Sequence, residues 1–244
     1  MRATRIVVEA ASVRARLVLS AGAVVPRLIE RGPRSARIAL VAGGALLLGG
    51  DRVEIVVTVG DGCELDLEDI GGTVAYGADG AASTWEAQIT LGAGARLRWA
   101  ALPLIVADGA DVRRRTRMRL GAGAIALVRE GVVLGRSGER GGRARLRTSV
   151  ADDGGPVLEE ALDVDGAHPV PGVLGTHRVV DTVVRVGDRP PASAVPGKAL
   201  LELDAPGAIA RYLGAAAHES PLATVWDQWS ALPAAEGDRV AVPA

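Results

Sequence analysis

Residues 85–101 read WEAQITLGAGARLRWAA, which is two alternating segments joined by a glycine turn. The apolar positions before the turn are Trp85, Ala87, Ile89 and Leu91, and those after it are Ala95, Leu97, Trp99 and Ala101. A period of two puts successive side chains on opposite faces of an extended chain, so each segment predicts a half-buried β-strand. Glycine adopts the positive φ that a tight reversal needs. This stretch therefore predicts strand, turn and strand.

The same turn recurs along the chain, at Gly60–Cys63, Ala78–Ala81, Gly92–Ala95, Ala107–Ala110 and Gly121–Ala124. Successive turns begin 14 to 18 residues apart. Further apolar or alternating segments follow at Ala126–Val133, Arg143–Val150, Leu158–Val164, Val179–Val186 and Leu200–Leu203. Short strands with regular turns and no helical period between them are typical of a mainly β fold, either a sandwich, a barrel or a solenoid.

The pattern changes near the C-terminus. Pro206–Ala217 is rich in alanine and carries Ile209, Tyr212 and Leu213 at helical spacing, and Asp204 is a candidate N-cap. A second short helix is expected from Leu222 to Leu232, and a Pro-rich loop from Arg189 to Pro196. We therefore expect one domain over residues 1–244, β-rich in 4–203, with a helical appendix in 204–232 and a frayed tail in 233–244.

Composition excludes several classes of protein. Of the 244 residues, 48% are apolar and 23% charged, and the net charge of −1 argues against a nucleic-acid-binding or polybasic membrane-surface protein. The N-terminus lacks the pattern of a signal peptide, and the longest uncharged run, Ile38–Gly50, is shorter than the ~18 residues that span a bilayer. A single cysteine, Cys63, excludes an intramolecular disulfide framework. We expect a soluble, cytoplasmic protein.

The usual enzyme motifs are absent from the sequence. It contains no P-loop, no Gly-x-Gly-x-x-Gly, no Cys-x-x-Cys, no His-Glu-x-x-His and no Gly-x-Ser-x-Gly. His168 and His177 flank a Pro/Gly loop beside Asp163 and Asp165, which makes a weak candidate for a metal site with nitrogen and oxygen ligands, against the simpler interpretation of solvated loop histidines.

Three carboxylates share one face of a predicted strand, because Glu64, Asp66 and Glu68 are spaced at period two. Like charges at this spacing repel each other unless nearby cations neutralise them. The row is either a path for a hard cation or nickel, or a solvent face paired with a basic strand, which we favour for most of these charges. The candidate basic partners are the period-two stripes Arg113, Arg115, Arg117, Arg119 and Arg143, Arg145, Arg147.

Over residues 3–215 the chain resembles the urease accessory protein D family, also called UreD or UreH. The segments that carry the resemblance, in order, are Gly49–Ile55, Val59–Leu65, Trp85, Leu97-Arg98-Trp99, Pro103, Gly109-Ala110, Arg114–Arg117, Gly121–Ala124, Glu130, Gly135-Arg136, Gly138-Glu139 and Gly172–Gly175. Where many members carry a Thr-rich stretch and a Lys-x-Tyr element, residues 68–76 here contain no lysine, so the chain looks like a divergent member.

The resemblance implies a chaperone with no enzymatic activity. Members of the family bind the F-type accessory protein, which recruits the G-type GTPase, and the assembly docks on apo-urease and assists nickel insertion through an internal passage. Transient Ni²⁺ and no tightly bound cofactor are implied. We assign the nickel passage to carboxylates, since a transit path needs weak ligands: Glu64, Asp66, Glu68, Glu130 and Glu139, with Arg136 ordering them.

Partner contacts are assigned to two groups of residues. Arg113 and Arg115 are expected to dock an acidic surface, and Tyr212, Trp226 and Trp229 to supply aromatic anchors, the alternative being that the tryptophans cover their own helix. Two other functions stay open: a self-assembling structural β-repeat protein, and a hydrolase that uses a carboxylate pair such as Glu130 and Glu139.

Overall fold

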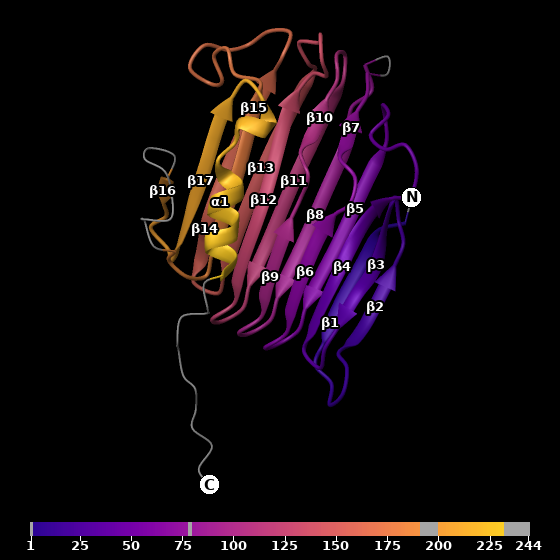
Figure 1. Cartoon of the computed structure of the whole chain (residues 1–244), viewed down its shortest axis with the longest axis vertical. Coiled ribbons are helices and arrows are strands. Elements are labelled where there is room, and N and C mark those ends of the chain that lie inside the picture. Colours follow the sequence, from indigo (N-terminus) through magenta and orange to yellow (C-terminus); the bar gives the residue numbers. More distant parts are fainter. Residues whose placement is uncertain (1, 78–79, 191–199, 232–244) are drawn as a thin grey trace.

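Two β-sheets face each other along the length of the molecule in the computed structural model, which describes residues 2–77, 80–190 and 200–231 (Figure 1). The seven-stranded first sheet has the order β14 (Gly155–Asp165), β13 (Arg143–Asp152), β11 (Asp111–Leu120), β8 (Ser83–Leu91), β5 (Arg52–Val59), β1 (Thr4–Glu9) and β2 (Arg16–Ser20). The second sheet has the order β16 (Leu200–Glu202), β17 (Gly207–Gly214), β15 (Val179–Val186), β12 (Ile125–Leu134), β9 (Arg96–Ala100), β6 (Glu64–Asp69), β4 (Ser35–Ala42) and β3 (Val24–Arg31). Two short strands, β7 (Thr73–Ala75) and β10 (Leu104–Val106), complete its ten.

The chain alternates between the two sheets, so consecutive strands of one sheet are parallel. β1, β5, β8, β11 and β13 pair in parallel in the first sheet, and β4, β6, β9 and β12 in the second. Antiparallel strands close both ends of the molecule, for example β1 with β2 and β13 with β14. This is a β-solenoid of about four turns. The predicted mainly β fold is confirmed, and of the forms considered it is the solenoid.

Three of the glycine turns stack on one another at one edge of the solenoid. Gly62 donates its backbone N–H to the carbonyl of Ala93 at 2.8 Å, and Gly94 donates to Ala122 at 2.8 Å, so the turns at 60–63, 92–95 and 121–124 lie side by side. The third residue of every predicted turn is a glycine with positive φ, between +59° and +82°. The turn predictions are confirmed within the described residues; positions 78 and 79 lie outside them.

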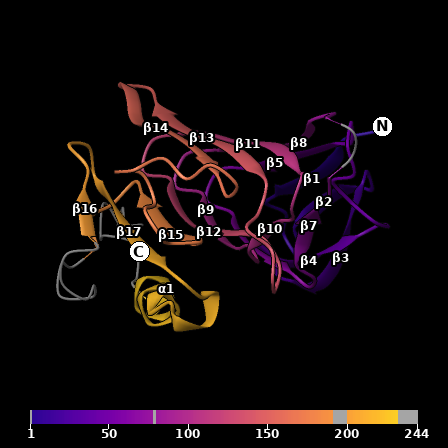
Figure 2. The ribbon, with the colours of Figure 1, turned by 90° about the horizontal axis from the view of Figure 1, so that it is seen from above.

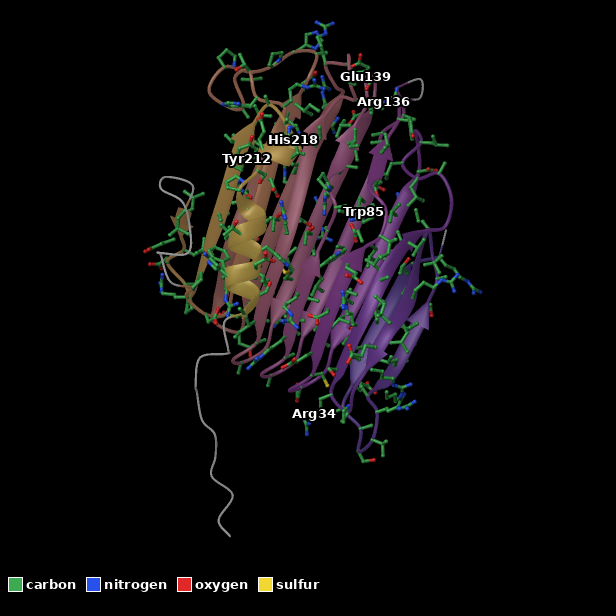
Figure 3. All side chains as sticks on the ribbon, viewed as in Figure 1. Arg34, Trp85, Arg136, Glu139, Tyr212 and His218 are labelled. Carbon is green, nitrogen blue, oxygen red and sulfur yellow. The ribbon has the colours of Figure 1, made fainter. Side chains whose placement is uncertain are left out.

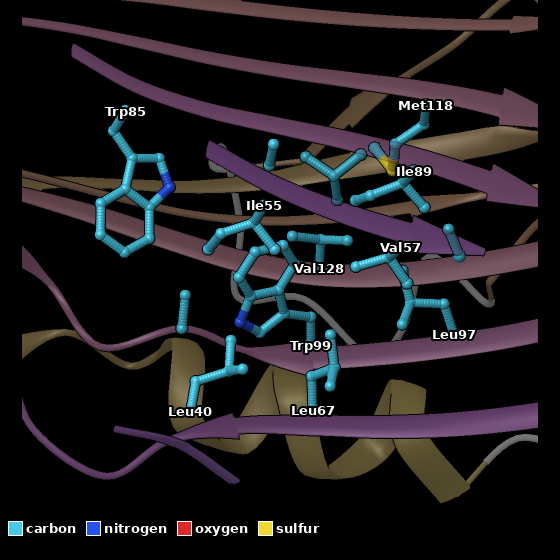
Figure 4. Packing of buried hydrophobic residues seen from close by; sticks show 14 of the residues in the cluster. Leu40, Ile55, Val57, Leu67, Trp85, Ile89, Leu97, Trp99, Met118 and Val128 are labelled. Atoms are coloured by element: carbon cyan, nitrogen blue, oxygen red, sulfur yellow. The ribbon is translucent and has the colours of Figure 1, made fainter. Parts of the chain in front are cut away.

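The hydrophobic core lies between the sheets, where the apolar phase of each strand points inward. Parallel pairing places equivalent residues next to each other, as with Val57, Ile89 and Met118 in the first sheet and Leu67, Trp99 and Val128 in the second. Trp99 lies among Ile55, Leu67 and Val128 in this core, and Trp85 lies to one side of them (Figure 4). The alternation read from the sequence therefore identifies the inward face of these strands correctly.

Helix α1 (Leu222–Ala231) packs on the outer face of the second sheet, over β12, β15 and β17 (Figure 2). Leu222, Val225 and Trp229 are completely buried there, against apolar residues of the three strands. The buried Arg185 guanidinium donates to the carbonyl of Trp229 near the helix C-terminus, and the Ser220 hydroxyl donates to Asp181 at 2.6 Å near its N-terminus. The helix predicted at 222–232 is confirmed as far as Ala231.

The helix predicted for Pro206–Ala217 is wrong, because the segment forms strand β17 followed by a 3-10 turn at Ala217–Glu219. Ala208 and Ala210 are buried under α1 and Ile209 faces the core, so both faces of the strand are apolar and no alternation appears in the sequence. Asp204–Gly207 makes a turn, with the Leu203 N–H bonded to the Gly207 carbonyl, in place of a helix start. Most of the predicted Pro-rich loop and the tail at 233–244 lie outside the described residues.

No helix in the described ranges is long and apolar enough to cross a membrane.

Candidate functional site

The interior of the solenoid changes from apolar to polar toward its C-terminal end. In the first sheet, Ile55 and Ala87 are followed on the next strands by Thr116, Thr148 and Glu160, all at the same register position. In the second sheet, a matching row joins Glu130, Thr182 and Arg211. Since inward positions elsewhere are apolar, these two facing rows form a polar band within the core.

Two ion pairs cross the interior from one sheet to the other. Arg114 of β11 donates from Nη2 to Glu130 Oε1 of β12 at 2.9 Å, and the Thr116 hydroxyl donates to the same oxygen at 2.7 Å. In the opposite sense, Arg211 of β17 contacts both carboxylate oxygens of Glu160 of β14, at 2.6 and 2.8 Å, and donates from Nε to Thr182. We call these seven side chains the interior polar site: Arg114, Thr116, Glu130, Thr148, Glu160, Thr182 and Arg211.

The interior polar site lines a partly open cavity of about 50 Å³, together with apolar residues such as Met118, Leu146, Leu162 and Val180. That volume holds a few water molecules or a small hydrated ion. Its lining includes two carboxylates, Glu130 and Glu160, and three arginines, Arg114, Arg147 and Arg211, with threonine hydroxyls beside them. Oxygen ligands of this kind suit hard or borderline divalent cations.

Asp69, at the end of β6, adds a further carboxylate to the same interior. Its oxygens accept hydrogen bonds from Trp99 Nε1 and from the Leu102 N–H, both at 3.1 Å. Burial raises the pKa of Asp69, and the bond from Trp99 and the positive charge of Arg114 act in the opposite direction. Asp69 therefore lies within the electrostatic reach of Arg114.

The predicted carboxylate row lies on the outer face of the second sheet. Each member is paired with an arginine: Glu64 with Arg96 at 3.7 Å, Asp66 with Arg98 at 2.7 Å and Glu68 with Arg37 at 3.0 Å. The expectation that a basic strand answers this row is right, but the stripes proposed as its partner are wrong. Arg113–Arg119 and Arg143–Arg147 belong to the first sheet, whereas the true partners come from β9 and β4, the strands on either side of β6.

Glu139 lies in the loop between β12 and β13, beside Arg136 and next to the turn at 107–110, at the opposite edge from the turn at 121–124 (Figure 3). It accepts hydrogen bonds from the Arg136 guanidinium at 2.9 Å and from the backbone N–H groups of Arg136 and Asp108. These bonds lower the pKa of Glu139 to about 2. Arg136 also stacks on the ring of Tyr76, at 5.7 Å from the centroid. Of the five carboxylates that Arg136 was expected to order, it is bonded to Glu139, whereas Glu64, Asp66, Glu68 and Glu130 are paired with other arginines.

The histidine candidates lie near the predicted carboxylates without forming a ligand cluster with them. His168 is largely exposed and its Nδ1 lies 3.5 Å from Asp165, whose carboxylate is also bound by Arg143. His177 lines a surface pocket of about 300 Å³, whose lining also includes Asp163, Asp165 and Glu139. Within residues 2–77, 80–190 and 200–231, no group of three or more His, Cys, Asp or Glu side chains is arranged to hold a metal ion.

The predicted partner-binding residues fall on two surfaces. Arg113 and Arg115 are exposed on the outer face of the first sheet, beside Arg145 and Arg147, which are paired with Asp111 and Asp163. On the other side of the molecule, Tyr212 lies near α1 (Figure 3), and its hydroxyl donates to the Ala216 carbonyl. Trp226 is half-buried and lines a groove of about 310 Å³ between α1 and the outer ion pairs, whereas Trp229 is fully buried.

Four residues of the interior were not singled out as site residues from the sequence: Asp69, Arg114, Glu160 and Arg211. The sequence pattern does mark three of them. Arg114, Glu160 and Arg211 are charged residues at strand positions whose neighbours two residues away are apolar or inward-facing. Glu160 lies between Leu158 and Leu162, and Arg114 follows Val112 at the same phase. Polar residues in the apolar phase of a strand therefore locate this site.

Comparison with known proteins identifies similar chains. A family model described as UreD urease accessory protein matches residues 7–239. A urease accessory protein UreD 1 from Streptomyces griseus subsp. griseus is 44% identical over 197 residues, which cover 79% of this chain and 76% of the relative. A urease accessory protein UreD from Streptomyces coelicolor is 34% identical over 209 residues, covering 77% and 82% of the two chains.

Proposed function

The chain belongs to the UreD family of non-enzymatic urease accessory proteins, and on this premise we propose that it carries nickel through its interior during urease maturation. In this proposal the protein forms a scaffold with the F-type and G-type accessory proteins on apo-urease and assists the insertion of Ni²⁺ into the urease active site. The ion is cargo and binds only transiently.

One observation carries the proposal: a polar cavity with two carboxylates lies inside an otherwise apolar solenoid. The side chains of Glu130, Glu160 and Arg211 are only 22%, 27% and 21% exposed, and that of Arg114 is 7% exposed. These charges lose most of their hydration, which costs free energy that apolar residues in the same place would not cost. Charged groups retained in a core are therefore candidates for function. The proposal gives Glu130 and Glu160 the leading role. Glu64, Asp66, Glu68 and Glu139 take secondary roles at the surface, because each is bonded to an arginine there.

The test is urease activation in a host whose own copy of this accessory gene has been deleted. The host is complemented with the wild-type chain, Glu130→Gln, Glu160→Gln or the matched control Glu159→Gln, which changes the neighbouring outward-facing residue of β14. We expect the two interior variants to assemble with the partners but to lower the nickel content and activity of urease several-fold. Activation equal to that of the Glu159→Gln control in both variants would refute the proposal. Glu68→Gln, tested alongside, measures the contribution of the outer row.

We further propose that partners dock on the basic row of β11, at Arg113 and Arg115, and alongside α1, at Tyr212 and Trp226. Exposed guanidiniums that follow one another on the outer face of β11, where Asp111 is already paired with Arg145, fit an acidic protein surface. The double variant Arg113→Glu with Arg115→Glu is expected to lose co-purification with the F-type protein or with apo-urease. Arg14→Glu with Arg27→Glu, two exposed positions elsewhere, is the charge-matched control. Equal recovery in both double variants would exclude this surface.

Trp229 has a different role in the proposal, because its side chain is completely covered. It holds α1 on the second sheet and so positions Trp226 and Tyr212 for contact. A partner that binds here touches α1 and the groove beside it, rather than Trp229 itself.

A further inference from the structure

Each carboxylate of the interior polar site is already neutralised by an arginine from the opposite sheet. Arg114 holds Glu130, and Arg211 holds Glu160. A divalent cation that binds the same carboxylate oxygen meets a positive charge a few ångströms away, in surroundings that screen charge poorly. Nickel can therefore use Glu130 or Glu160 only if the guanidinium moves aside.

The two arginines differ in how firmly they are held. Arg211 uses Nη1 and Nη2 on Glu160 and Nε on Thr182, so every side of its guanidinium is bonded. Arg114 makes one hydrogen bond, from Nη2 to Glu130, while its Nε is buried without a hydrogen-bond acceptor. The side chain is 7% exposed and lines the cavity. A buried donor without a partner costs free energy, so Arg114 is the less satisfied of the two.

A second carboxylate, Asp69, lies on the same inner face of the second sheet as Glu130. The residues before these two, Glu68 and Arg129, both pair with Ala100 of β9, so the two carboxylates are at the same register position two strands apart. Asp69 is bonded to Trp99 and to the backbone of Leu102, and the positive charge of Arg114 lowers its pKa against the effect of burial. The Arg114 guanidinium carbon lies 6.0 Å from the centroid of the Trp85 ring, whose face attracts a planar cation. Arg114 is therefore hydrogen-bonded to one of two carboxylates on this inner face, and the other is within the range of its charge.

We propose that Arg114 is a displaceable counter-ion, which holds Glu130 in the empty protein and turns toward Asp69 when Ni²⁺ takes its place on Glu130. The identity of the cation rests on the proposed function. In this exchange the Arg114–Glu130 contact breaks, a Ni²⁺–Glu130 contact forms and an Arg114–Asp69 contact forms. No proton or electron is transferred, and the carboxylates remain ionised throughout.

The exchange explains how a buried carboxylate can hold nickel weakly. Part of the binding free energy of the ion is spent on displacing Arg114, so the ion does not become trapped. When the ion leaves, Arg114 returns and Glu130 is not left as an unpaired buried charge.

The first test is isothermal titration of the purified full-length chain with NiCl₂. Arg114→Met removes the charge and keeps a chain of similar bulk, and Arg117→Met, an exposed position on the same strand, is the matched control. We expect Arg114→Met to bind Ni²⁺ at least about tenfold more tightly than wild type, because the competing cation is gone. Arg117→Met should bind like wild type, and Glu130→Gln in the Arg114→Met background should remove the gain. Equal affinities in Arg114→Met, Arg117→Met and wild type would overturn the proposal.

A second variant, Asp69→Asn, tests the proposed movement of Arg114 even if Arg114→Met fails to fold. Asp69→Asn leaves the Arg114–Glu130 pair in place, keeps a side chain of the same shape and removes the charge that would receive Arg114. We expect Ni²⁺ to bind Asp69→Asn several-fold more weakly than wild type. Unchanged affinity in Asp69→Asn would overturn the exchange.

The failure of this inference and the failure of the proposed function give different results. If Glu130→Gln and Glu160→Gln activate urease normally while Arg114→Met still tightens nickel binding, the proposed function fails and the exchange stands. If the Glu variants abolish activation but nickel affinity does not respond to Arg114 or Asp69, the exchange fails alone.

Discussion

Replacing Gly121 with alanine is a sharp test of the stacked glycine turns. A Cβ at this position would lie 2.8 Å from the carbonyl carbon of Gly92, 2.9 Å from the Ala93 nitrogen and 3.0 Å from the Leu91 oxygen. All three atoms belong to the backbone of the preceding turn of the solenoid, so no side chain can rotate away. Ordinary contacts of a Cβ are 3.4–4 Å, and the two turns must therefore separate by roughly half an ångström.

The expected cost follows from comparing three glycines. Forcing an extra methyl group against packed atoms costs about 1–3 kcal/mol, which is the expectation for Gly121→Ala, whose φ is ordinary. Gly123 has φ +66° and open space around it, so Gly123→Ala isolates the left-handed backbone penalty of about 1–2 kcal/mol. Gly71 has neither constraint, and Gly71→Ala should change the free energy of unfolding by less than about 0.5 kcal/mol or stabilise slightly.

Urea denaturation followed by tryptophan fluorescence measures all three, since Trp85 and Trp99 are buried in the core that these turns close. The slope of the free energy against urea should be equal in the four proteins, so differences in midpoint report stability. If Gly121→Ala unfolds at the same urea concentration as Gly71→Ala, the turns do not stack as described and the reasoning is refuted.

Three further predictions concern the packing of α1, the loop at Glu139 and the thiol of Cys63. Trp229→Ala should cost about 3–5 kcal/mol and reduce the helical signal in circular dichroism, because the side chain is fully buried between α1 and the sheet; the half-buried Trp226→Ala is the control, and equal effects would contradict the packing. Glu139, with its pKa lowered from 4.5 to about 2 by Arg136, stabilises the fold fully above pH 4.5 and loses this contribution as the pH falls toward 2. Glu139→Gln should thus unfold at lower urea than wild type at pH 7, with the gap closing below pH 4.5; a gap that does not depend on pH would argue against the pair. Burial raises the pKa of the Cys63 thiol, so Ellman's reagent at pH 8 should label it only after denaturation, and rapid labelling of the native protein would show that the thiol is accessible.

The sequence predicts best those strands whose two faces differ or, as in β15, whose residues are mostly β-branched. β8 and β11 alternate strictly between buried and more exposed residues, so their sequences predict strands. The sequence of β17 does not predict a strand, because α1 covers its outer face and makes Ala208 and Ala210 as buried as Ile209. Burial on both faces removes the period of two, and an Ala-rich segment then resembles a helix. The covering element lies later in the chain, so local pattern alone cannot reveal it.

The second limit on prediction from the sequence is that it does not show which strands pair with each other. Glu64, Asp66 and Glu68 were correctly placed on one face, but the arginines that answer them come from strands fixed only by the parallel register of β4, β6 and β9. In β11 the exposed arginines drew attention to the outer face, while Arg114, at an inward position of the same strand, belongs to the interior polar site. An arginine stripe and an inward arginine differ only by strand phase, which the apolar residues Val112 and Met118 define.

The stacked turns limit where the chain can gain residues. Gly92 and Gly121 begin successive turns at one edge, and a Cβ on either would meet the backbone of the preceding turn. At the other edge the turn at 107–110 is packed in the same way, because a Cβ on Gly77 would lie 2.8 Å from the carbonyl oxygen of Asp108. An inserted residue at either stack would separate neighbouring coils of the solenoid, whereas the loop at 166–178 runs over the surface and most of its residues are exposed. A reporter peptide or affinity tag placed inside the chain should therefore be grafted into this loop.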